Sequence, residues 1–149
     1  MTTESTTQRV NEAARPGLRA LDVLVGRWRI SGEARGETTF AWLPGGFFLE
    51  RRATISQGDT THHSREIIGC EKAGTASAAE DVTSRAYTDT GDTLDYTYEL
   101  TGDTLTIWIG PRGSPAVARA VLSEDRNTLA GAWEWPGGGY EFALTRIVE

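Results

Sequence analysis

The chain has 149 residues, a length that fits one domain with a buried core. Its formal net charge is −6 and no run of Lys or Arg stands out, which disfavours a nucleic-acid partner. No apolar stretch approaches the roughly 20 residues that a membrane-spanning helix needs, so no membrane span is expected. The one cysteine, Cys70, excludes an internal disulfide framework and favours a reducing compartment.

The N-terminal segment is rich in Thr, Ser, Glu and Gln and contains no aromatic side chain. We interpret residues 1–16 as a flexible tail and residues 17–149 as a single β-barrel domain. The segment lacks the apolar run of a secretory signal, so a cytoplasmic location is expected.

A short helix is predicted over 18–26. Leu18, Leu21, Leu24 and Val25 have helical spacing, and a glycine, Gly26, follows them. A helix of two turns is unstable alone, so we expect it to pack against the rest of the chain.

The rest of the chain alternates between apolar and polar residues, with turn residues between the segments. The predicted strands are 28–34, 38–43, 47–55, 61–69, 82–88, 93–100, 104–109, 117–123, 128–135 and 140–148. No crossover helix separates them, so the strands must run antiparallel in a meander. We predict an all-β fold, an antiparallel up-and-down barrel, because closure removes the two unpaired edges of an open sheet. A two-sheet sandwich is the alternative.

Closure would pair the first and last strands and bring Trp28 close to Arg146. An arginine lying across an indole face would plug that end of the barrel, a contact worth roughly 0.5–2 kcal/mol. The short helix before Trp28 would cover the same opening.

The Gly26-Arg27-Trp28 sequence after a short helix, with a late Arg146, resembles the pattern of calycins, the superfamily of lipocalins and fatty-acid-binding proteins. More narrowly, the chain resembles a bacterial family of lipocalin-like domains, through LVGRW, WLPGGFFLERR, EIIG, GDTLTIW and GAWEWPGGGYEFALTR. The resemblance implies a barrel with an internal cavity and no established activity. The related nitrobindin-type barrels hold haem through a histidine near the C-terminus. Residues 130–149 contain no histidine, so no haem or other cofactor is expected.

Alternation along each strand assigns most of the 5 Trp, 4 Tyr and 4 Phe residues to inward faces. These aromatic residues either fill the barrel as ordinary core or line a pocket for one small ligand. The residues expected at the ligand are Phe40, Trp42, Phe47, Leu49, Arg51, Glu66, Arg85, Tyr96, Tyr98, Trp133 and Phe142.

Charged residues on these apolar faces are informative because a buried charge needs a partner. Arg51 and Glu66 lie on neighbouring strands and are predicted to pair, with Arg85 as a candidate third member. The functional interpretation is a polar anchor for a carboxylate or carbonyl group of a ligand. The alternative is an internal salt bridge with a structural role.

His62 and His63 are adjacent, so on a strand they point to opposite faces and cannot bind one metal together. No cluster with metal-ligand spacing accompanies them, and no metal site is expected. We interpret the two as a surface pair, with an acid–base role left open for either one. Cys70 has no adjacent base and is interpreted as inert.

The sequence therefore favours binding of a small hydrophobic or amphipathic molecule inside the barrel. The alternative is a cofactor-independent isomerase or cyclase with Glu66, Arg51 and Tyr96 as candidate catalytic residues. A third interpretation is a homodimer or partner module that acts through outward aromatic residues such as Trp108 or Phe48.

Overall fold

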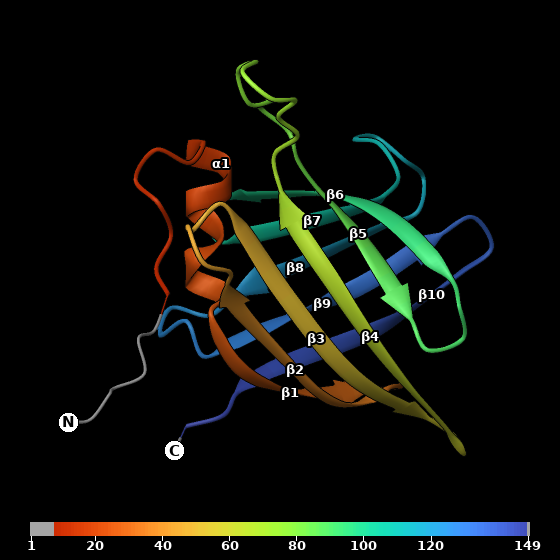
Figure 1. Cartoon of the computed structure of the whole chain (residues 1–149). Coiled ribbons are helices and arrows are strands. Elements are labelled where there is room, and N and C mark those ends of the chain that lie inside the picture. The colour runs from red at the N-terminus through yellow and green to blue at the C-terminus, as the bar shows by residue number, and fades with distance from the viewer. Residues whose placement is uncertain (1–7, 149) are drawn as a thin grey trace.

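A computed structural model describes residues 8–148, which form one closed antiparallel barrel with a short helix at one end (Figure 1). The strands are β1 (Gly26–Gly32), β2 (Arg35–Trp42), β3 (Phe48–Gln57), β4 (Thr60–Gly69), β5 (Val82–Thr88), β6 (Thr93–Thr101), β7 (Thr104–Ile109), β8 (Val117–Leu122), β9 (Thr128–Trp135) and β10 (Gly138–Arg146). Each strand pairs with its neighbours in sequence, and β1 also pairs with β10. The predicted all-β, ten-stranded up-and-down barrel is confirmed.

The helical segment consists of α1 (Pro16–Arg19) followed directly by the 3₁₀-helix η1 (Ala20–Leu24). Pro16 suits the first turn because its missing N–H would have no partner there. Leu18, Leu21 and Leu24 are buried in the core, so the predicted helix packs as expected. Among the described residues, no helix is long and apolar enough to cross a membrane.

Part of the predicted N-terminal tail, residues 1–7, lies outside the described residues. The segment that follows contacts the turn between β2 and β3. The backbone N–H of Asn11 donates to the carbonyl of Gly46 at 2.9 Å, and its side chain donates to the carbonyl of Gly45 at 3.0 Å. Ala14 is buried in the core. Asn11 and Ala14 therefore pack against the barrel ahead of Pro16.

The closing strands meet as predicted. Trp28 lies opposite Arg146, and the guanidinium is 4.2 Å from the centre of the indole ring. The guanidinium also donates to the carbonyls of Val23 and Val25, at 2.8 and 2.7 Å. Trp28 is fully buried, and its indole N–H donates to the carbonyl of Leu24 at 2.9 Å. This end of the barrel is therefore closed by a stacked pair that is hydrogen-bonded to the helical segment.

The two ends of the barrel differ in packing. The fully buried large side chains lie at the end covered by α1 and η1, and include Leu18, Leu21, Leu24, Trp28, Leu49, Ile68, Leu122 and Leu129. The opposite end carries the β3–β4, β5–β6 and β9–β10 hairpins (Figure 1). Large apolar side chains are exposed there, namely Leu94, Ile109 and Trp135. We call the end covered by α1 and η1 the closed end, and the end with these hairpins the open end.

Candidate ligand site inside the barrel

A pocket of about 380 Å³ occupies the barrel interior and is lined by residues from all ten strands. Its aromatic lining residues are Phe40, Tyr96, Tyr98, Trp133, Trp135, Tyr140 and Phe142. The polar lining residues are Arg51, His62, Ser64, Glu66, Thr88 and the tyrosine hydroxyls. An apolar wall with a few polar groups is typical of small-molecule sites.

At the open end, Trp135 and Tyr140 flank the pocket from β9 and β10. Their rings meet edge to face with centres 6.0 Å apart. Trp135 remains 42% exposed, and Leu94 and Ile109 on the same rim are also exposed. Because apolar side chains left in water are unfavourable, this rim offers surface that an apolar ligand would cover.

The main polar feature of the pocket is a charged pair formed by Arg51 on β3 and Glu66 on β4. The two residues lie opposite each other in the β3–β4 ladder, with Arg51 Nη1 3.9 Å from Glu66 Oε1. Glu66 is only 5% exposed. Its Oε2 accepts hydrogen bonds from the Tyr98 hydroxyl at 2.5 Å and the Ser84 hydroxyl at 2.6 Å. The predicted pairing of Arg51 with Glu66 is confirmed.

Arg51 is fixed from the side away from Glu66. Its Nε donates to Thr38 Oγ1 at 2.8 Å, and the Thr38 hydroxyl donates in turn to the carbonyl of Arg52 at 2.9 Å. The guanidinium carbon lies 5.4 Å from the centre of the Phe40 ring, within cation–π range. The backbone thus determines the position of the guanidinium through Thr38.

Two tyrosines lie beside this pair. Burial, reinforced by the charge of Glu66, raises the pKa of Tyr96 to about 12 and that of Tyr98 well above its ordinary value. Both phenols are therefore protonated at neutral pH, and the Tyr98 hydroxyl donates its hydrogen bond to Glu66. The Tyr96 ring also packs against Trp133, with ring centres 6.2 Å apart.

The raised pKa of Tyr96 predicts a loss of stability at alkaline pH. In the unfolded chain this phenol ionises near its ordinary pKa of 10.0, whereas in the native protein its pKa is about 12. The contribution to the free energy of unfolding is complete below about pH 10. It is lost as the pH rises to about 12, by at most about 3 kcal/mol. In urea unfolding, Tyr96→Phe should lose less stability than the wild type across this range. Tyr87→Phe, at an exposed ring, is the control, and identical slopes for the wild type and Tyr96→Phe would contradict the prediction.

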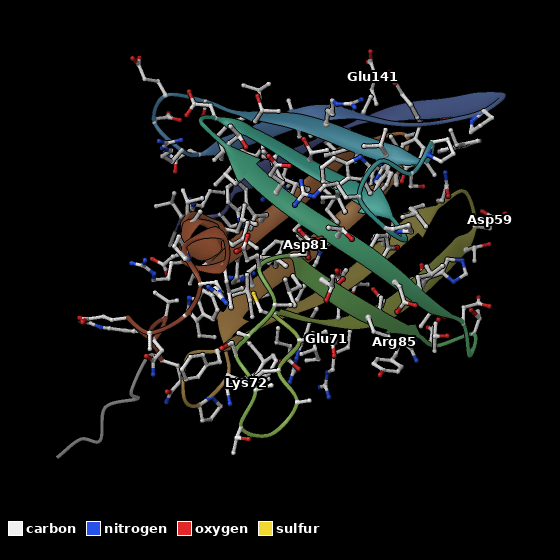
Figure 2. All side chains as sticks on the ribbon, turned by 90° about the horizontal axis from the view of Figure 1, so that it is seen from above. Asp59, Glu71, Lys72, Asp81, Arg85 and Glu141 are labelled. Atoms are coloured by element: carbon white, nitrogen blue, oxygen red, sulfur yellow. The ribbon has the colours of Figure 1, made fainter. Side chains whose placement is uncertain are left out.

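The structure corrects the placement of two predicted ligand residues. Phe47 precedes β3 in the turn and is 41% exposed, because the alternation of the strand begins only at Phe48. Arg85 points away from the interior (Figure 2) and pairs with Asp95 on the outer face, with Nε 2.9 Å from Oδ1. Arg85 therefore does not join Arg51 and Glu66, because the inward residues of β5 are Val82, Ser84 and Ala86.

Two further predicted residues belong to the packed closed end. Trp42 is buried and donates its indole N–H to Asp22 Oδ1 at 2.8 Å. Leu49 is fully buried in the core. Neither residue lines the pocket, whereas the other predicted residues do, namely Phe40, Arg51, Glu66, Tyr96, Tyr98, Trp133 and Phe142.

Two polar residues that hold the charged pair in place were not predicted. Ser84 donates to Glu66, and Thr38 positions Arg51; both are buried. The alternation of β5 could have indicated Ser84, because this residue lies on the same face of the strand as Val82 and Ala86.

The histidines and the cysteine lie at the edges of this arrangement. His62 and His63 are both exposed, as expected. His62 borders the open end of the pocket, with its Nδ1 3.8 Å from Asp89 Oδ1. His63 Nδ1 lies 3.2 Å from Thr54 Oγ1. Burial raises the pKa of the Cys70 thiol, which makes it a poor nucleophile at neutral pH. Within residues 8–148, no three His, Cys, Asp or Glu side chains come together as a metal site.

No protein-family model and no curated protein matches this chain. The up-and-down barrel is consistent with a calycin-like fold, which agrees with the resemblance in the sequence at the level of architecture. A functional interpretation therefore rests on the chemistry of the pocket.

Proposed function

We propose that the barrel binds a small hydrophobic or amphipathic molecule in its interior. The observation that carries the proposal is the combination of an aromatic, apolar lining with one buried charged pair, Arg51 and Glu66. A volume of about 380 Å³ lies in the lower part of the range of roughly 300–1,000 Å³ that is usual for ligand pockets. A ligand of modest size is therefore favoured.

The difference between the two ends of the barrel also supports binding. The closed end is filled by its own side chains, whereas Leu94, Ile109 and Trp135 at the open end leave apolar surface in contact with water. Each Å² of this surface that a ligand covers gains about 25 cal/mol. An amphipathic molecule would place its polar group at the charged pair and its apolar part toward the rim.

The test is a fluorescence titration with N-phenyl-1-naphthylamine, a neutral apolar probe. We expect enhanced probe emission together with quenching of Trp133, which lines the pocket. Ala118→Phe fills the pocket from β8 and should weaken probe binding by at least about tenfold. Ala130→Phe, at an exposed position on β9, is the matched control and should leave binding unchanged. Equal binding by both variants would reject an internal site.

The alternative proposal, an isomerase or cyclase, is favoured by one feature of Glu66. Oε1 borders the pocket, and no described residue donates a hydrogen bond to it. A carboxylate oxygen open to a bound substrate is what general-base catalysis requires. The test is the exchange of the α-hydrogens of cyclohexanone in D₂O, followed by NMR. If Glu66 is the general base, the wild type catalyses this exchange, and Glu66→Gln removes it while still binding the probe.

The cytoplasmic location and a homodimer remain predictions.

A further inference from the structure

The charged pair in the pocket leaves a gap between its two members. Arg51 Nη1 and Glu66 Oε1 are 3.9 Å apart, longer than a hydrogen bond. Glu66 Oε2 already accepts two hydrogen bonds, and Arg51 Nε is already bound to Thr38. At the charged pair itself, Arg51 Nη1 and Glu66 Oε1 form no hydrogen bond with another described residue, so the gap places one donor group opposite one acceptor.

The charge balance at this gap opposes a charged ligand group. Arg51 contributes one positive charge and Glu66 one negative charge. Apart from the tyrosines, the pocket wall of residues 8–148 contains one other titratable side chain, His62, at the open end. A ligand carboxylate that bound Arg51 would be held against Glu66, and an ammonium group that bound Glu66 would be held against Arg51. Like charges brought together away from water cost several kcal/mol.

We propose that the pocket selects a neutral head group that both accepts and donates a hydrogen bond, and that this group is an alcohol hydroxyl. This inference rests on the proposed binding function. A hydroxyl oxygen about 2.8 Å from both atoms would accept a hydrogen bond from Arg51 and donate its proton to Glu66. The apolar part of the alcohol would pack along Trp133 toward Trp135 at the open end. The sequence had favoured a carboxylate or carbonyl at this position, and neither group can donate to Glu66.

The experiment compares four molecules with one chain length: decanol, decane, decanoate and decylammonium. Each is titrated at neutral pH against the wild-type protein loaded with N-phenyl-1-naphthylamine. Decanol and decane are kept below their solubility limits, and decanoate and decylammonium below the concentrations at which they form micelles. We expect decanol to displace the probe at least about tenfold more effectively than decanoate or decylammonium, and more effectively than decane. Equal or tighter binding of decanoate or decylammonium would overturn the head-group inference and leave the binding function standing. Failure of the probe and of all four molecules to bind would overturn both.

A charge variant tests the same inference in the opposite direction. Glu66→Gln removes the negative charge and leaves Arg51 uncompensated, so the preference should shift from decanol toward decanoate by at least about tenfold. Glu37→Gln is the matched control because Glu37 is exposed on the outer face of β2 and pairs with Arg27 there. If Glu66→Gln retains the wild-type circular dichroism spectrum and its ratio of decanol to decanoate affinity is unchanged, the inference is contradicted. If that variant does not fold, the decanol-to-decanoate ratio of the wild type decides.

Discussion

Replacing Trp28 with alanine is expected to lower the free energy of unfolding by about 3–5 kcal/mol, measured by denaturant unfolding. Trp28 is fully buried, stacks on the guanidinium of Arg146 and donates a hydrogen bond to the carbonyl of Leu24. The variant leaves a large void beneath the helical segment and removes both contacts together.

Trp135→Ala is the control for this prediction. That indole is part-exposed on the rim of the open end, so its removal should change the free energy of unfolding by less than about 1 kcal/mol. Similar losses for the two variants would show that the closed end is no more important for stability than the rim. Trp28→Phe keeps part of the stacking surface and should fall between the wild type and Trp28→Ala.

Gly131→Ala is expected to destabilise the barrel by about 3 kcal/mol, because the added methyl group has no space. A Cβ at Gly131 would lie 1.9 Å from the carbonyl oxygen of Arg119 and 2.5 Å from Cα of Ala120. Both atoms belong to the backbone of the paired strand β8, so the β8–β9 ladder itself would have to move. Thermal unfolding should show a lower midpoint for the variant.

Ala130→Ser, at the neighbouring exposed position, is the control for Gly131→Ala. It keeps the backbone spacing and should unfold within about 0.5 kcal/mol of the wild type. An unchanged midpoint in Gly131→Ala would mean that β8 and β9 separate at this position without cost.

The closure of the barrel was predictable from a few residues. Ten alternating segments without a crossover helix allow only a meander, and closing the meander places the first strand against the last. The pairing of Trp28 with Arg146 follows from that geometry. The pairing of Arg51 with Glu66 was predictable in the same way, because both interrupt apolar faces of adjacent strands.

The finer composition of the pocket was not predictable, for physical reasons. Arg85 was a candidate third member of the charged pair, but the sequence of β5 does not show which face is inward when the buried residues are as small as Ser84 and Ala86. Phe47 continues the alternation of inward and outward residues in β3, but it lies in the turn before the strand, where side chains do not alternate between two faces. The hydrogen bonds of Thr38 and Ser84 depend on distances between strands, which no local pattern encodes.

The position of β10 has a consequence for biosynthesis. β10 pairs on one side with β1 and on the other with β9, so Gly138–Arg146 completes both ladders. A nascent chain that has not yet released these residues from the ribosome exposes two strand edges at once, each able to pair with another chain. Closure joins β1 to β10, which lie far apart in the sequence, and such long-range pairing slows folding. Until β10 emerges, the free edges of β1 and β9 are therefore open to pairing with another chain.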